Sequence, residues 1–263
     1  MQLRYFTLFS LLVALALFVA CGKGEDKQIQ NEDVILPKSY ISVGDSMIYG
    51  LACDGCSDSV LVLLPDSGGD PVFYNILEAR MNRKVFGRPS IGDNLAIMTD
   101  SLNPDVITML VNIEKVKGTW YYYEMPHLRH HIAQQDSNAV NRMLTPEQKE
   151  RRDSFLRQYM VPREYVYTLK RDYTMVTSGG PPRNSSLDAN TPVEYPKIKR
   201  YTEWHLHNGK LILTYGGMPV SGGRDSVELV NDTAEFVLLR NDTMALRING
   251  EVRGFKLKPD TIQ

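Results

Sequence analysis

Apolar and polar residues alternate along most of the chain after Val34, and turn residues separate the apolar runs. This pattern is typical of half-buried β-strands. In the first half the apolar runs are Val60 to Leu64, Val72 to Leu77, Leu95 to Met98 and Val106 to Ile113. About five short strands in roughly 80 residues predict a small barrel of OB-like type between Val34 and Val116.

The last part of the chain predicts an antiparallel meander. Its expected strands are Tyr201 to Leu206, Lys210 to Tyr215, Ser226 to Val230, Glu235 to Leu239, Met244 to Ile248 and Val252 to Leu257. Asn208-Gly209 and Asn249-Gly250 are two-residue hairpin signals, because both central positions of a type I′ turn need positive φ. The chain is therefore expected to be mostly β.

One helix is expected to interrupt the strands. Thr145-Pro146-Glu147-Gln148 combines an N-cap, a proline at the first helical position and a capping-box glutamine. The helix is predicted to run to about Met160, ahead of Pro162. Its buried stripe is expected to contain Phe155, Leu156 and Tyr159.

The first 20 residues have the three zones of a signal peptide. Arg4 supplies a positive start, the run from Tyr5 to Val19 is almost wholly apolar, and Ala20 precedes Cys21. An apolar run of roughly 15 residues is short for a membrane span, which needs about 20. We expect Cys21 to begin the mature chain, to carry the acyl chains and to be followed by a tether to Asp33. The alternatives are cleavage elsewhere or an uncleaved anchor.

Three motifs resemble a known family. Leu17 to Cys21 is similar to a bacterial lipobox, although Phe18 stands where leucine is usual. Glu78 to Asn82, followed by Ile91-Gly92-Asp93 and a strand, resembles the first module of Bacteroidota lipocalin-family lipoproteins. Gly118-Thr119-Trp120 resembles the Gly-x-Trp start of the first lipocalin strand.

The resemblance to Bacteroidota lipocalin-like outer-membrane lipoproteins implies an architecture. An OB-like barrel (34–116) is followed by a lipocalin-like antiparallel barrel (117–258) with one inserted helix, and by a short tail (259–263). In that family the glycine lets the backbone turn and the tryptophan closes the barrel. A late basic residue packs over the tryptophan, and Arg247 and Arg253 are both candidates.

The resemblance and the tether together suggest a location. Glu25 and Asp26 look like the acidic signal that sends some of these lipoproteins to the outer face of the outer membrane. We expect an outer-membrane protein anchored by lipid, with the face undecided. The formal charge of -1 gives no electrostatic footprint for nucleic acid and no polybasic patch for anionic lipid.

The CxxC motif Cys53-Asp54-Gly55-Cys56 has several possible functional interpretations. A thioredoxin-like site needs a βαβ context, a haem site needs histidine where Ser57 stands, and a zinc site needs a second ligand pair. A local disulfide between Cys53 and Cys56 is the leading interpretation in an oxidising compartment.

Three histidines lie close together in sequence after the first lipocalin-like strand. On a helix His127 would share a face with His130 and His131, which makes a conceivable divalent-metal site. No HExxH motif accompanies them, and exposed histidines in a connecting segment are the alternative. No cofactor is expected.

Aromatic residues in or beside the predicted barrel strands are the candidate ligand site. Inward-facing aromatics with polar tips can line the cavity of an eight-stranded barrel. The candidates are Trp120, Tyr121, Tyr123, Tyr167, Trp204 and Tyr215. The alternative is that these side chains simply fill the interior.

Asp-Ser/Thr followed by a non-aromatic apolar residue occurs seven times, where chance predicts about one or two. The triplets resemble the O-glycosylation sequon of Bacteroidota extracytoplasmic proteins. The candidate acceptors are Ser46, Ser59, Ser101, Ser226, Thr233, Thr243 and Thr261. Turn chemistry before strands is the alternative source of the triplets.

The sequence contains no GxSxG, P-loop, GxGxxG or HExxH motif. We therefore expect a non-enzymatic lipoprotein that binds a small, partly apolar ligand in its second barrel. The alternative is a structural or interaction subunit of an envelope protein complex. A metal-dependent or redox enzyme is a third, weaker hypothesis.

Overall fold

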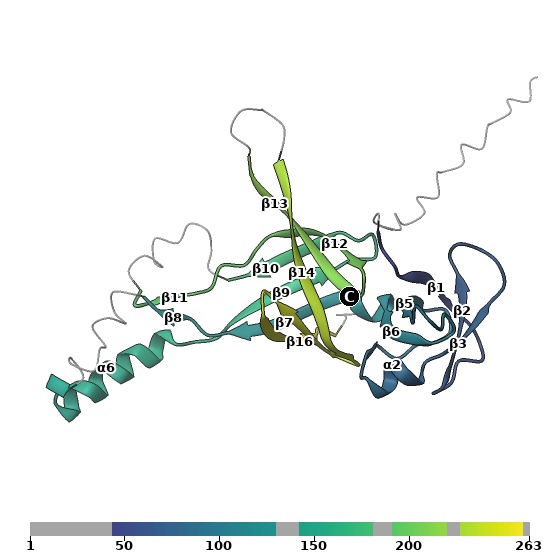
Figure 1. Cartoon of the computed structure of the whole chain (residues 1–263). Coiled ribbons are helices and arrows are strands. Elements are labelled where there is room, and N and C mark those ends of the chain that lie inside the picture. The colour runs from purple at the N-terminus through teal and green to yellow at the C-terminus, as the bar shows by residue number, and fades with distance from the viewer. Residues whose placement is uncertain (1–43, 130–141, 181–190, 220–226, 260–263) are drawn as a thin grey trace, which may run out of the picture. The chain divides into compact units, whose positions relative to one another are not determined.

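A computed structural model of the chain describes residues 44–129, 142–180, 191–219 and 227–259. They form a mostly β protein, as predicted, which contains a six-stranded sheet, an eight-stranded sheet and a two-stranded sheet (Figure 1). Within these residues no helix has the length and apolar character needed to cross a membrane. The leader, Cys21 and the tether lie outside the described part of the chain.

The six-stranded sheet forms the first module and has the strand order β3-β2-β1-β5-β6-β4. Its strands are β1 (Ile48–Ala52), β2 (Val60–Pro65), β3 (Val72–Asn75), β4 (Val85–Phe86), β5 (Asn94–Thr99) and β6 (Ile107–Asn112). Helix α2 (Leu77–Met81) follows β3, and the short helix α3 (Ile113–Val116) follows β6. A parallel bridge between Asn75 and Val106 brings the end of β3 beside the start of β6.

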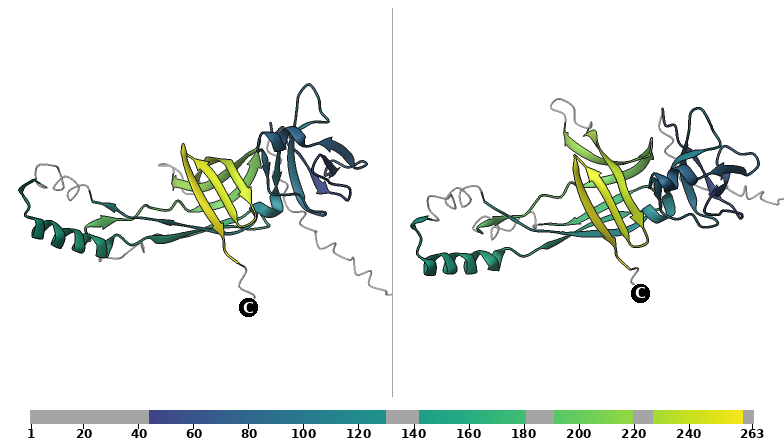
Figure 2. Two further views of the ribbon diagram at one scale, coloured as in Figure 1. Left: turned by 90° about the horizontal axis from the view of Figure 1, so that it is seen from below. Right: turned by 60° about the horizontal axis from the view of Figure 1, so that its bottom comes forward.

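The eight-stranded antiparallel sheet curls into a nearly closed barrel (Figures 1 and 2). Its strands are β7 (Gly118–Glu124), β9 (Arg163–Leu169), β10 (Met175–Gly179), β12 (Tyr201–His207), β13 (Lys210–Pro219), β14 (Val227–Arg240), β15 (Thr243–Ile248) and β16 (Glu251–Leu257). The order is β10-β9-β7-β16-β15-β14-β13-β12, and a bridge between Thr174 and Glu203 links the two edge strands.

The predicted hairpins are confirmed. Asn208 and Gly209 have φ of 48° and 75°, and Asn249 and Gly250 have φ of 52° and 85°. These pairs connect β12 to β13 and β15 to β16, as the type I′ geometry requires. The segments expected as two strands, 226–230 and 235–239, are one continuous strand, β14, because their pairing with β13 is unbroken between them.

The predicted helix is α6 (Pro146–Tyr159), and its capping box forms. Thr145 Oγ1 accepts the Gln148 N–H, and Gln148 Oε1 accepts the Thr145 N–H. The expected buried stripe is wrong, because no α6 side chain is buried and Phe155 is 49% exposed. Figures 1 and 2 show the reason: the helix lies well away from the barrel. Beside it β8 (His127–Leu128) pairs with β11 (Val193–Glu194).

The first module packs against one end of the barrel through a shared core. Phe86 from β4 contacts Phe236 from β14 at 5.4 Å between ring centroids. The β12–β13 hairpin also docks there, since Asn208 Oδ1 accepts hydrogen bonds from the N–H and hydroxyl of Ser46. A Cβ on Gly209 would lie 2.4 Å from Met109 Sδ, so this close approach requires glycine.

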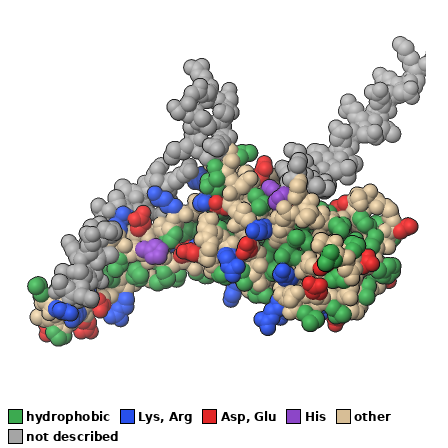
Figure 3. Space-filling view, viewed as in Figure 1, with side chains coloured by type: hydrophobic (Ala, Val, Ile, Leu, Met, Phe, Trp, Pro, Cys, Tyr) green, Lys and Arg blue, Asp and Glu red, His purple; other side chains and the backbone are tan. Residues whose placement is uncertain are grey.

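Apolar side chains also lie on the outer surface of the first module (Figure 3). Those exposed there include Phe73, Leu77, Met81 and Ile91. Leu77 and Met81 belong to α2, which places apolar groups next to Arg80, the arginine of that helix.

Candidate functional site

Two tryptophans close the barrel at the end that faces the first module. Trp120 and Trp204 are both 0% exposed. Trp120 Nε1 donates to the Val116 carbonyl at 2.8 Å, and Trp204 Nε1 donates to the Lys170 carbonyl at 3.1 Å. Each buried indole N–H is therefore satisfied by the backbone just outside the barrel. We call this the tryptophan end.

The barrel has two seams, the first between β7 and β16 and the second between the edge strands β10 and β12. Both are held at the tryptophan end. The ladder between β7 and β16 contains only Trp120↔Leu257 and Tyr121↔Lys256, and Lys258 N donates to Thr119 O nearby. At the other seam Trp204 N donates to Tyr173 O at 2.9 Å. Toward the opposite end, where β7 ends and β16 begins, the strands of the first seam no longer pair. We call this end the mouth.

Aromatic rings fill the middle of the barrel in a continuous network. Tyr122 stacks on Tyr165 at 5.2 Å and meets the edge of Phe255 at 5.1 Å between centroids. Phe255 contacts Tyr167 at 5.2 Å, and Tyr167 contacts Tyr201 at 5.8 Å. The network reaches Tyr215 through Tyr201. Because these rings touch, they fill the middle of the barrel between the tryptophans and the mouth.

A half-buried ion pair takes the place of backbone pairing at the mouth of the first seam. The Arg253 guanidinium lies 4.6 Å from the Tyr122 ring centroid and donates to Tyr122 Oη at 3.2 Å. Its Nη2 lies 3.3 Å from Glu124 Oε2. That Oε2 is buried and accepts no hydrogen bond from the described residues. A buried carboxylate oxygen with an open acceptor position favours a ligand that can donate to it.

A second charged group lies across the ring network. Asp232 is buried, and its Oδ2 accepts hydrogen bonds from Tyr201 Oη and Lys199 Nζ, both at 2.6 Å. The Lys199 ammonium also lies 4.9 Å from the Tyr215 ring centroid. Tyr167, whose ring contacts both Tyr122 and Tyr201, connects this group to the arginine. We name the charged residues and their tyrosine partners the mouth cluster: Tyr122, Glu124, Lys199, Tyr201, Asp232 and Arg253.

Burial sets the charge states of the mouth cluster. Burial raises the pKa of Tyr122 and of Tyr201, and the hydrogen bond to Asp232 raises that of Tyr201 further. Burial alone would lower the pKa of Arg253, but attraction to Tyr122 and Glu124 outweighs it and the pKa is raised. The pKa of Lys199 is likewise raised, because its bond with Asp232 outweighs its burial. Near neutral pH the tyrosines are neutral donors and both cations are charged.

The structure separates the six aromatic candidates. Trp120, Tyr167 and Trp204 are buried inside the barrel, and Tyr215 is half-buried at the edge of the ring network. Tyr121 and Tyr123 alternate with the buried residues of β7 and so face outward, and Tyr123 is 61% exposed. Of the two candidates for covering Trp120, Arg253 stacks on Tyr122 instead, and Arg247 faces outward and pairs with Glu235.

The expected disulfide is not formed. Cys53 and Cys56 are free thiols. Cys56 Sγ lies 3.1 Å from the Cys53 carbonyl oxygen and also accepts the Val62 N–H, whereas Cys53 Sγ lies 3.8 Å from the Leu51 carbonyl. The two sulfur atoms are thus turned toward different backbone groups of the turn.

The histidine site is only partly described. His127 is exposed on β8 opposite Glu194, and His130 and His131 lie outside the described residues. In the described residues no three His, Cys, Asp or Glu side chains are grouped closely enough to hold a metal ion.

The candidate glycosylation positions lie at turns and on outer strand faces. Ser46, Ser59, Ser101 and Thr233 are exposed, Thr243 is half-buried, and Ser226 and Thr261 lie outside the described residues. The Asp45 and Asp100 carboxylates accept the N–H two residues ahead, which is turn chemistry. In the triplet that contains Thr233, Asp232 points into the barrel.

Sequence reasoning did not identify the mouth cluster. A period-two count along β7 places Glu124 on the same face as Trp120 and Tyr122, so this residue carried a usable signal. Arg253 was one of two candidates for the late basic residue that the family resemblance implies, although its partner there was expected to be Trp120. Lys199 and Asp232 carried no signal, because strand pairing alone brings these distant segments together.

Comparison of the chain with protein-family models, with curated protein sequences and with solved structures finds no match. The function proposed below therefore rests on the geometry of the barrel.

Proposed function

We propose that this chain is a membrane-anchored, non-enzymatic lipoprotein that binds a small, partly apolar ligand at the mouth of its barrel. The observation that carries the proposal is the half-buried pair of Arg253 and Glu124 among tyrosine rings, with the buried Glu124 Oε2 lacking a hydrogen-bond donor. A few convergent polar groups among apolar side chains are typical of small-molecule sites.

The cluster defines the chemistry of the ligand. An apolar or aromatic body would lie against the rings of Tyr122 and Tyr165. A hydroxyl or amine would donate to Glu124 Oε2, and an acceptor on the ligand would take a hydrogen bond from Arg253.

The sequence supports the proposed location of the protein, and the strand orders support the proposed types of its two barrels. The leader ending at Cys21 favours an acylated chain at the outer membrane, with either face open. The strand order of the first module, with its parallel Asn75–Val106 bridge, supports an OB-like barrel. Gly118 at φ 139° beside the buried Trp120 supports a lipocalin-like second barrel.

The test is to identify the small molecules that copurify with the chain. The full acylated chain is isolated from its own membranes in mild detergent and extracted with organic solvent, and the released small molecules are identified by mass spectrometry. The mouth variant Arg253→Met/Glu124→Gln removes the ion pair without leaving an unpaired charge. The control Arg247→Met/Glu235→Gln removes an Arg–Glu pair on the outer face of the same sheet.

A compound present at about one per chain in the wild type and the control, but absent from the mouth variant, supports the proposal. Equal amounts in all three proteins, or no compound in the wild type, contradict it.

A second function, as an interaction subunit of an envelope protein complex, is favoured by α6. Isolated helices of this length are marginal in water and usually gain stability by packing, yet α6 buries none of its side chains. The rings of Phe155 and Tyr159 contact each other on this helix at 5.1 Å between centroids.

The double variant Phe155→Glu/Tyr159→Glu tests this role. It should dissociate a larger assembly seen on native gels of solubilised membranes without changing the urea midpoint of the chain. Unchanged migration would reject this role.

A further inference from the structure

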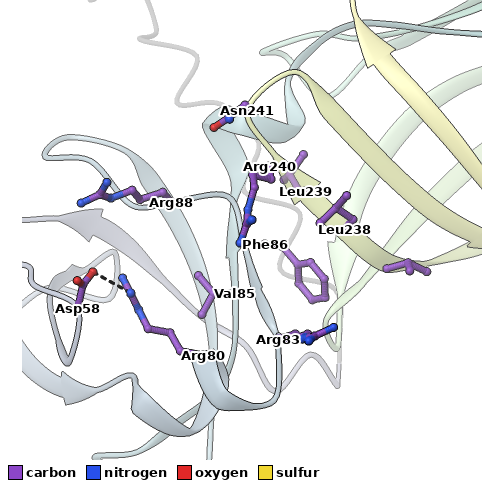
Figure 4. Close-up of a pocket in the computed structure, with 11 residues that line it drawn as sticks. Asp58, Arg80, Arg83, Val85, Phe86, Arg88, Leu238, Leu239, Arg240 and Asn241 are labelled. Atoms are coloured by element: carbon purple, nitrogen blue, oxygen red, sulfur yellow. Dashed lines mark ion pairs between the residues drawn. The ribbon is translucent and has the colours of Figure 1, made fainter.

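A groove lined by arginines lies where the first module meets β14. It has a volume of about 780 Å³ and is lined by Asp58, Arg80, Arg83, Val85, Phe86, Arg88 and residues 237–241. Figure 4 shows the side chains of Arg80, Arg83, Arg88 and Arg240 arranged around Val85 and Phe86. Four arginines thus line the groove together with Val85 and Phe86, and the Arg80 guanidinium is turned to Asp58.

The formal charge of -1 predicted no polybasic patch, but the fold brings these four arginines together, and their positive charge is largely uncompensated. Asp58 is the single acidic residue in the lining, and it pairs with Arg80 at 2.8 Å. Arg83, Arg88 and Arg240 are exposed and form no ion pair within the described chain. Arginines held near one another without carboxylates create a field that attracts anions.

Arg80 adds an independent sign of a missing ligand. Its Nε atom is buried and has no hydrogen-bond acceptor among the described residues. A buried donor without an acceptor is unfavourable, and an oxygen atom of a bound anion would satisfy it. The guanidinium fork also matches phosphate oxygens in geometry.

The floor and surroundings of the groove are apolar. Val237 and Leu238 are about two-fifths exposed, and Met81, which lies in sequence between Arg80 and Arg83, is 83% exposed. The volume is in the range of sites that hold drug-sized molecules, so an inorganic anion would occupy a small part of it.

We propose that this groove binds the phosphate-bearing headgroup of a membrane lipid, with the upper part of the acyl chains against Val237 and Leu238. The site is separate from the mouth cluster and shares no residue with it. Basic pockets in membrane proteins bind anionic lipid headgroups through the same pairing of cationic side chains with phosphate.

The experiment uses the full chain in neutral detergent micelles, with native mass spectrometry to count retained lipids. The probes are dioleoyl phosphatidylglycerol and, for comparison, dioleoyl phosphatidylcholine. The groove variant is Arg83→Gln/Arg88→Gln/Arg240→Gln. The control variant Arg142→Gln/Arg151→Gln/Arg200→Gln removes the same charge from exposed arginines outside the groove. Circular dichroism and urea midpoints establish that all three proteins are folded.

The wild type and the control should retain phosphatidylglycerol in preference to phosphatidylcholine, and the groove variant should lose affinity for phosphatidylglycerol by about 100-fold. A tenfold excess of glycerol 3-phosphate should not displace the lipid. Three results would overturn the proposal: retention by the groove variant, an equal loss in the control, or displacement by the soluble phosphate, which would make the groove a site for free phosphate.

Discussion

The two ends of the barrel are held together by different kinds of interaction. At the tryptophan end backbone hydrogen bonds close both seams, and Trp120 and Trp204 are fully buried with satisfied indole N–H groups. At the mouth side chains replace the ladder, and Arg253 joins β16 to Tyr122 and Glu124 of β7.

This difference assigns stability to the tryptophan end of the sheet and ligand binding to its mouth. Buried rings and backbone bonds stabilise a closed end against which the first module packs. The Arg253–Glu124 pair at the mouth remains partly hydrated, so it stabilises the fold less than the buried rings do. A ligand can therefore compete with the contacts of the mouth without opening the core.

The largest expected effect comes from removing a closing ring. Trp120→Ala should lower the free energy of unfolding by about 3–5 kcal/mol, because it empties a packed site. Urea denaturation followed by circular dichroism measures it. The control Tyr123→Ala, on the outer face of the same strand, should change stability by no more than about 0.5 kcal/mol. Equal losses in the two variants would remove the distinction between inner and outer faces.

A smaller loss is expected from the second charged group of the mouth cluster. Asp232→Ala leaves the buried Tyr201 hydroxyl without its acceptor and should cost about 2 kcal/mol. Glu235→Ala removes an exposed carboxylate from the same strand and should cost about 0.5 kcal/mol or less. If Asp232→Ala destabilised the protein more than Trp120→Ala, the mouth would be the structural end.

The glycine at the start of β7 tests the geometry of the closed end. Gly118 has φ of 139°, and an added Cβ would lie 2.7 Å from Leu257 Cδ1. Gly118→Ala should cost about 1–2 kcal/mol, chiefly through backbone strain. Gly254→Ala, where no atom lies within 4 Å of the added Cβ, should be close to neutral in the same thermal unfolding assay. A neutral Gly118→Ala would show that the turn into β7 tolerates a side chain.

Raised tyrosine pKa values predict a weak dependence of stability on alkaline pH. Burial raises the pKa of Tyr122, Tyr167 and Tyr201, so the folded protein keeps protons that the unfolded chain releases. Stability should be constant below about pH 9 and fall by about 1 kcal/mol by pH 10.5, allowing for partial exposure. Tyr201→Phe should reduce this slope, and Tyr123→Phe should not. A rise in stability over this interval would contradict the assigned burial.

Local sequence signals predicted the local structure correctly. Asn208-Gly209, Asn249-Gly250 and the capping box of Thr145 and Gln148 all form, because each depends on φ preferences or bonds within four residues.

Properties that depend on distant segments were not predictable. The apolar residues of α6 indicated a buried stripe, but the barrel lies well away from the helix and does not cover them. The mouth cluster assembles residues from β7, β14, β16 and the segment before β12, which only the strand order brings together. Two of the three adjacent tyrosines of β7 face outward, and the strand's register alone decides which.

Amide hydrogen exchange of the full chain, measured along β7 and β16, tests the central claim most directly. We compare only the amides of β7 and β16 that face their shared seam, because the other amides pair with β9 and β15 along the whole strands. Those in segments 117–121 and 255–259, where the seam is paired, should exchange at least about tenfold more slowly than those in segments 122–125 and 250–254 at the mouth. Equal rates at the two ends, or slower exchange at the mouth, would contradict a barrel closed by its tryptophans and open for a ligand at the other end.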